Sequence, residues 1–203
     1  MAESGSWPSI LERGLLSTQA LVDMYQPGEA LRREILQQVR RRMVILHREG
    51  LPDAAVRDQL PLKFISQRLL PGDTLQDFLD ALNSRVFFHV AEDRLHRLLG
   101  ARAYRGAPHD VLICDTRKLL LAHDDVDLAP YNTGSVHVPN MPARGPSTFV
   151  HLEDYPWEYW RRKRGETDAV VELTIKHSAL LESSILRVES WYDGKLASIT
   201  FER

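Results

Sequence analysis

One carboxylate in this chain occupies a position that needs an explanation. Residues 169–175 read Ala-Val-Val-Glu-Leu-Thr-Ile, and a run so rich in apolar and β-branched residues is typical of a buried strand. Glu172 stands in its middle, where a charge is costly unless it is paired or used. Alternation places Glu172 on the face opposite Leu173 and Ile175. That face is either solvent, which makes Glu172 an ordinary surface residue, or the wall of a cleft.

A carboxylate in a cleft has a definite chemistry. It can orient a sugar hydroxyl, or stabilise positive charge that develops as a C–N glycosidic bond breaks through an oxocarbenium-like state. Residues 131–135, Tyr-Asn-Thr-Gly-Ser, carry small polar groups that suit a nucleotide or its acceptor, although plain turns have the same composition. Three aromatic residues within 157–160 precede four consecutive cations at 161–164. They either stack on nucleic-acid bases or pack against the protein.

The strongest catalytic motifs are missing from the sequence. It contains no GxxxxGK[ST] phosphate loop, no GxGxxG after a strand, no HExxH and no GxSxG. Cys114 is the only cysteine, which excludes an internal disulfide and any site built from several cysteines. The eight histidines are scattered without a close pair at metal-ligand spacing, so we predict no metal site. The hydrolase and metalloenzyme classes gain no support.

Composition indicates an ordinary globular protein. A chain of 203 residues is long enough for one sizeable core and short for two, so we expect a single domain over residues 1–203. The net charge of −2 gives no overall attraction to nucleic acid, although basic tracts occur at 32–48 and 161–164. We expect no membrane segment and no secretory signal, and the single cysteine favours a cytoplasmic protein.

The elements that would position these residues follow from periodicity and capping signals. They predict helices at 6–14, 17–26, 29–42, 53–56, 74–83, 91–99, 116–122 and 154–164. Strands are predicted at 85–90, 109–115, 126–128, 148–152, 169–176, 185–191 and 195–201. Asp193-Gly194 should form the turn of a terminal hairpin. We therefore expect an α+β fold with a helical N-terminal half and a mostly antiparallel C-terminal sheet, and a long loop at 130–147.

Four segments, taken in order, resemble the DarT-like ADP-ribosyltransferases, which modify nucleic-acid bases using NAD. They are residues 9–15, 57–62, 149–160 and 171–175. A closer resemblance, over nearly the whole chain, is to an uncharacterised bacterial domain family. It rests on Ser-Trp-Pro-Ser-Ile-Leu at 6–11, Val-Phe-Phe at 86–88, Ala-Arg-Ala-Tyr at 101–104 and Asn-Thr-Gly-Ser at 132–135.

The resemblance implies an ADP-ribosyltransferase-like fold and specific roles, with NAD as the substrate that donates ADP-ribose. Glu172 would be the catalytic glutamate that orients the NAD ribose. Arg57, with Arg42 as second choice, would neutralise the pyrophosphate, because a guanidinium fork suits phosphate. The nicotinamide end would lie near Ser17 and Thr18. The acceptor, a nucleic acid or a protein, would meet the loop that carries Asn132 and Ser135.

One feature of such transferases has no counterpart here. They usually open with a strand whose histidine holds the NAD ribose, whereas this sequence begins at Met1, five residues before the Trp7 helix. We therefore expect a sheet without its first strand. A non-catalytic binding module on the same fold remains an alternative, as does a toxin that hydrolyses NAD outright. The oligomeric state is left open.

Overall fold

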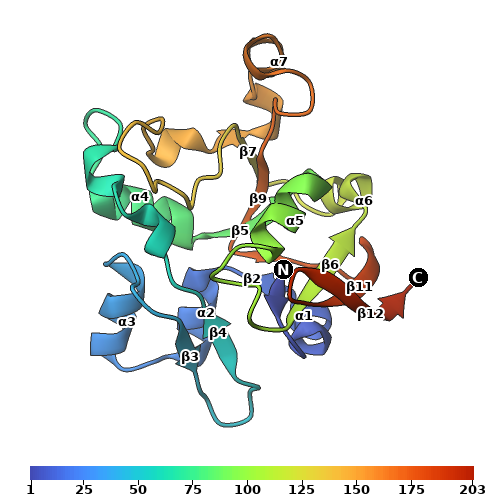
Figure 1. Ribbon diagram of the computed structural model, residues 1–203. Helices are drawn as coiled ribbons and strands as arrows, with labels where there is room; N and C mark the ends of the chain where they lie inside the picture. Colours follow the sequence, from blue (N-terminus) through green and yellow to red (C-terminus); the bar gives the residue numbers. More distant parts are fainter. The chain divides into compact units, whose positions relative to one another are not determined.

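The computed structural model describes residues 1–203 and has mixed α+β architecture (Figure 1). The chain forms two compact units. Unit 1 comprises Met1–Leu15, His89–Asp124 and Ala179–Arg203, and unit 2 comprises Leu16–Phe88 and Asp125–Ser178. The α+β class expected from the sequence is confirmed, while the single domain stays a prediction. No helix is both long and apolar enough to cross a membrane.

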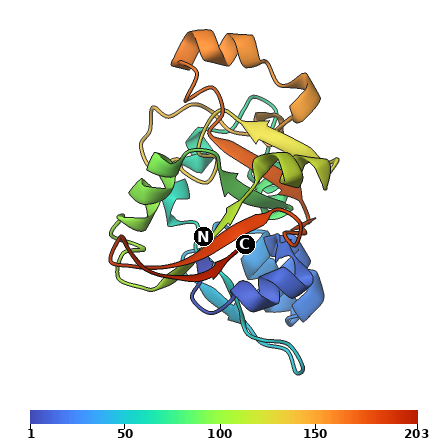
Figure 2. The same cartoon turned by 90° about the vertical axis from the view of Figure 1, so that its right-hand side faces the viewer.

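Unit 1 is built on a four-stranded sheet in which every pair is antiparallel. In sheet order its strands are β1 (Ala2–Glu3), β6 (His109–Cys114), β11 (Ile185–Tyr192) and β12 (Lys195–Glu202). Its helices are α1 (Trp7–Arg13), α5 (Glu92–Leu99) and α6 (Thr116–Leu121). Figure 2 shows β11 and β12 as a long twisted hairpin, in red. Asp193 and Gly194 form its turn with φ of 51° and 69°, which confirms the Asp-Gly prediction.

The start of unit 1 is held against β6 by a buried carboxylate. The short strand β1 pairs with β6 through Ala2 and Asp110. The Gly5 N–H then donates to Asp110 Oδ2 at 2.8 Å, just ahead of α1. The strand β1 is only two residues long and carries no histidine, so the absence of the histidine-bearing first strand stays a prediction.

The last residue of β5 (Arg85–His89) supplies a pH-dependent term to the stability of unit 1. The His89 Nδ1 atom is buried without a hydrogen-bond partner. Burial, helped by the amino terminus and Arg94, lowers the pKa of His89 to about 4. Because the unfolded histidine keeps its ordinary pKa near 6.5, protons bind the unfolded chain more readily between these values.

We therefore expect the free energy of unfolding to fall as the pH drops from about 6.5 towards 4, by about 3 kcal/mol at most. Urea titrations at several pH values measure it. The His89→Gln variant, which cannot titrate, should lose most of this slope. If wild type and variant lose stability equally over that range, His89 is not its source.

Unit 2 holds the second four-stranded sheet, ordered β5, β9 (Glu172–Lys176), β7 (Val126–Ala129) and β8 (Val150–His151). A separate antiparallel hairpin pairs β3 (Val44–Leu46) with β4 (Ala54–Val56). The helices are α2 (Thr18–Tyr25), α3 (Glu29–Leu36), α4 (Leu75–Asn83) and α7 (Trp157–Arg164). Short 3₁₀ turns lie at Leu60–Leu62, Ile65–Gln67, Pro146–Thr148 and Leu152–Asp154. Two short strands, β2 (Leu15–Leu16) and β10 (Ser178–Ala179), lie where the chain passes from one unit to the other.

Two apolar clusters stabilise unit 2. The first joins α2, α3 and the β3–β4 hairpin, and consists of Val22, Tyr25, Ile35, Leu36, Val44, Leu46 and Val56. The second packs α4 against the loops around β7 and β8, and consists of Leu62, Ile65, Phe78, Leu82, Ala129, Val136 and Phe149. A capping box begins α4, where helix 74–83 was predicted: Thr74 and Asp77 satisfy each other's backbone N–H groups.

Three local expectations are wrong. Residues 53–56 do not form a helix, because Ala54–Val56 pairs with Val44–Leu46 as a strand. The third helix ends at Leu36 rather than at residue 42, because the Arg40 side chain turns inward and donates to the Ile35 carbonyl at 2.8 Å. The helix expected from Asp154 starts only at Trp157, since Asp154 lies in a 3₁₀ turn.

Candidate functional site

Glu172 is the first residue of β9 and is buried, with only 5% of its surface exposed. Every residue from Ala169 to Ile175 is buried, so both faces of this segment are covered. The surface alternative for Glu172 is therefore wrong. Its neighbour β7 fixes the position, because Glu172 pairs with Ala129 and the Val171 N–H donates to the Ala129 carbonyl at 2.9 Å.

The Glu172 carboxylate is bound by the loop that follows β7. Thr133 donates twice to Glu172 Oε2, from its backbone N–H at 3.0 Å and from its hydroxyl at 2.6 Å. The Thr133 side chain is fully buried. Hydrogen bonds to a carboxylate are stronger than neutral ones, so these two fix both the loop and the orientation of the carboxylate.

Arg144 is a buried cation whose charge is felt by the Glu172 carboxylate; its exposed fraction is 0%. Its guanidinium donates to the Pro142 carbonyl at 2.6 Å and to the Asn132 and Ser135 carbonyls at 3.3 and 3.5 Å. Burial lowers the pKa of Arg144, while Tyr131 and Glu172 oppose that shift. Arg144 therefore ties the two ends of the long loop together and provides positive charge for Glu172.

The Tyr131 ring links this site to α7. The Arg144 guanidinium lies over the ring at 4.5 Å and that of Arg164 at 5.4 Å. Trp160 meets the same ring edge-on with centroids 5.5 Å apart. Arg164 also donates to the Pro130 carbonyl. The end of α7 is therefore attached to the loop that holds Glu172.

The structure brings together the predicted catalytic residue and the predicted acceptor loop. Asn132 and Ser135 flank Thr133, the residue that binds Glu172. Ser17 and Thr18 lie elsewhere, at the start of α2. Ser17 caps this helix by accepting from the Ala20 N–H, and its own N–H donates to the carbonyl of His177. His177 is five residues beyond Glu172, or about 16 Å along a strand.

Arg57 follows β4 and belongs to a segment that reaches the Glu172 loop. In that segment the Pro61 carbonyl accepts from the Val136 N–H at 2.8 Å. Arg40 holds the other end, since its Nε donates to the Arg57 carbonyl at 2.9 Å. Burial lowers the pKa of Arg40 to about 10, and Asp58 opposes that shift.

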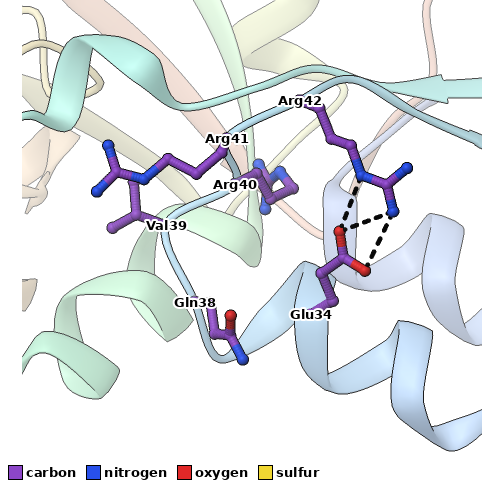
Figure 3. Close-up of a pocket in the computed structure, with 6 residues that line it drawn as sticks. All are labelled: Glu34, Gln38, Val39, Arg40, Arg41 and Arg42. Atoms are coloured by element: carbon purple, nitrogen blue, oxygen red, sulfur yellow. Dashed lines mark hydrogen bonds and ion pairs between the residues drawn. The ribbon is translucent and has the colours of Figure 1, made fainter.

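Arg42, the second choice for the pyrophosphate, lines a surface pocket of ≈ 350 Å³ between the end of α3 and residues 38–42 (Figure 3). It forms an ion pair with Glu34 at 3.1 Å, and both side chains are exposed. Arg40 lines the same pocket, but its guanidinium is engaged by Ile35 and Asn83. Neither arginine presents an unengaged fork there.

Sequence reasoning singled out residues 131–135 but missed that Thr133 binds Glu172, and it missed the roles of Arg144 and Arg40. Arg144 had one usable signal. It is the only Asp, Glu, Lys or Arg between residues 132 and 152, and it lies in a proline-rich loop. Arg40 looked like one member of a solvated arginine tract. No group of three or more His, Cys, Asp or Glu side chains is arranged to hold a metal ion.

Comparison with known proteins gives a family without an activity. No curated protein and no solved structure matches the chain. The family of unknown function DUF7002 matches residues 1–185, which include every site residue named above. The chain therefore belongs to DUF7002, a family of unknown function.

Proposed function

We propose that this protein is an ADP-ribosyltransferase-like enzyme that cleaves NAD with Glu172 as its catalytic carboxylate. One observation carries the proposal: Glu172 Oε2 is fixed by two hydrogen bonds from Thr133, in the loop of Asn132 and Ser135. A carboxylate held in one orientation suits electrostatic catalysis, because it need not reorganise as charge develops. The order of segments that resembles DarT-like transferases supports the same assignment.

The reaction breaks the bond between ribose C1′ and the nicotinamide nitrogen. The bonding electrons leave with nicotinamide, and the ribose becomes oxocarbenium-like. Glu172 opposes this positive charge and accepts a hydrogen bond from a ribose hydroxyl. The acceptor, a nucleic-acid or protein nucleophile, then bonds to C1′ and loses a proton. If water is the acceptor, the same site hydrolyses NAD.

Arg57 is the proposed pyrophosphate ligand. Its segment is hydrogen-bonded to the Glu172 loop through Pro61 and Val136, and Arg40 holds its backbone. A guanidinium binds two phosphate oxygens with parallel hydrogen bonds, which a flexible ammonium cannot imitate. Ser17 and Thr18 remain proposed contacts for the nicotinamide end.

A second candidate is a non-catalytic binding module on the same fold. It is favoured by the full engagement of the Thr133 side chain with Glu172 and by the buried guanidinium of Arg144 beside them. In this case the carboxylate serves only to fix the loop. The two candidates differ in what happens to NAD, and one experiment separates them.

Isothermal calorimetry with NAD, followed by an assay for released nicotinamide, tests the proposal. We expect NAD to bind and the Arg57→Ala variant to bind about ten-fold or more weakly, since a hydrogen bond to a charged group contributes about 1.5–3 kcal/mol. The matched control is Arg42→Ala, which should bind NAD like the wild type. Binding without nicotinamide release favours the binding module. Absence of heat at millimolar NAD contradicts the transferase and leaves the binding module, whose ligand is unknown, as the better candidate.

A further inference from the structure

The helix α7 buries none of its residues, unlike every other helix of unit 2. Figures 1 and 2 both show it standing away from the sheet of unit 2, in orange. Trp157 and Tyr159 are 44% and 48% exposed. Burial of large aromatic side chains is normally favourable, so their exposure on a charged helix suggests an external partner.

The charge on α7 is largely unneutralised. Only Arg161 has carboxylate partners, Glu158 at 3.1 Å and Glu166 at 3.8 Å. The next three residues have no carboxylate within ion-pair distance: Arg162 donates to the Glu158 carbonyl, Lys163 to the Tyr159 hydroxyl and Arg164 to the Pro130 carbonyl.

The other basic tract of unit 2 is different. Arg32 forms an ion pair with Asp23 at 2.8 Å, and Arg33 with Glu29 at 3.7 Å. Arg42 is paired with Glu34, and Arg40 is buried. Arg41 and Arg48 of that tract are exposed and have no carboxylate partner, but they are not consecutive in the sequence. In α7, by contrast, three consecutive cations lack a carboxylate partner.

The aromatic rings of α7 form a continuous series with the cations. Tyr159 meets Trp160 at 4.9 Å and Trp160 meets Tyr131 at 5.5 Å, each edge-on. Lys163 lies 5.2 Å from the centroids of both Tyr159 and Trp160. Because the three rings meet edge-on, they lie in different planes, and the Lys163 ammonium lies beside two of them.

We propose that α7 is a docking element for single-stranded nucleic acid. Cations that track a phosphate backbone, interleaved with aromatic rings on which bases stack, are the features that bind single strands without sequence preference. A membrane-surface helix needs an apolar face, and Trp157–Arg164 contains no aliphatic residue. The docking needs neither NAD nor Glu172, so it holds independently of the proposed reaction.

Fluorescence anisotropy with labelled oligodeoxythymidine and oligouridine, at several salt concentrations, tests this proposal. Each bound phosphate contributes about −0.7 to the slope of log K against log salt for single strands. Replacing Arg162 and Lys163 together by Gln should therefore flatten the slope by about 1.4. The Trp157→Ala/Tyr159→Ala variant should bind about ten-fold more weakly with an unchanged slope. Circular dichroism verifies that the variants fold, since substitutions in α7, which has no buried residues, should leave the fold intact.

The matched control is Arg32→Gln/Arg33→Gln, which removes the same charge from two arginines that are paired with carboxylates and should leave binding unchanged. The Glu172→Gln variant should also bind normally, which separates docking from NAD chemistry. The relative affinity for the two oligonucleotides tells whether DNA or RNA is preferred. Equal weakening by the control, duplex bound as tightly as single strands, or binding to anionic vesicles but not to oligonucleotides would each overturn the proposal.

Discussion

The Glu172→Gln variant should lose NAD cleavage by about 10²–10³-fold while keeping its fold. The amide oxygen can still accept the two hydrogen bonds from Thr133, so the loop stays in place. The negative charge is gone, however, and removal of one group that stabilises the transition state typically costs about this factor. Release of labelled nicotinamide measures the loss, and the melting temperature verifies the fold.

The Glu172→Ala variant should lose both activity and stability. It leaves the Thr133 N–H and hydroxyl without their acceptor, and it removes the carboxylate charge that favours the buried cation of Arg144. Removing one partner of a buried charged network costs about 3–5 kcal/mol. Denaturant titration of both variants therefore separates the chemical role of the carboxylate from its structural one.

The control for these variants is Thr133→Val, which keeps the backbone donor to Glu172 but loses the hydroxyl. It should retain most of the fold and show an intermediate rate. Should Glu172→Gln cleave NAD as fast as the wild type, Glu172 has no part in catalysis. If that variant is stable while only Glu172→Ala unfolds easily, the carboxylate is a structural brace and the binding module becomes the better candidate.

The sequence predicted elements best where a local signal was strong. The helices predicted at 17–26 and 74–83 begin at the caps Ser17 and Thr74, and the Asp193-Gly194 turn closes the hairpin. These features depend on residues within a few positions of each other. The question of whether Glu172 is paired, used or exposed also arose from the sequence, because an apolar run around a charge is itself visible.

The partners themselves were hidden because they come from distant parts of the chain. Thr133 is 39 residues from Glu172, and Arg40 is 43 residues from Asn83. Arg40 also ends α3 early by turning its side chain inside, which periodicity alone cannot indicate, since neighbouring arginines remain exposed. Residues 53–56 became a strand for a similar reason: pairing with Val44–Leu46 outweighed the capping tendency of Asp53.

Arg85→Ala should destabilise unit 2 by about 3–5 kcal/mol, because it leaves the buried charge of Asp127 without its partner. Arg85 at the start of β5 donates to Asp127 Oδ2 on β7 at 2.7 and 3.1 Å. Both side chains are nearly buried, and the guanidinium also lies 4.3 Å over the Phe149 ring. Denaturant titration measures the loss.

A double substitution tests the cause of that loss. Arg85→Met combined with Asp127→Leu removes both charges, and well-packed apolar pairs can replace buried ion pairs at little cost. We therefore expect the double variant to be more stable than Arg85→Ala. The exposed pair Glu29 and Arg33 is the control, where either alanine substitution should change stability by about 0.5 kcal/mol.

The ion pair also bears on the candidate site through the sheet. Asp127 pairs with Thr174, two residues from the Ala129–Glu172 pair, and its carbonyl accepts from the Thr174 hydroxyl at 3.3 Å. Loosening β5 from β7 should therefore weaken the register that places Glu172. If the β7–β9 register positions Glu172 for catalysis, NAD cleavage by Arg85→Ala should fall at temperatures well below its melting temperature. An unchanged rate there would show that the β7–β9 register holds without this ion pair.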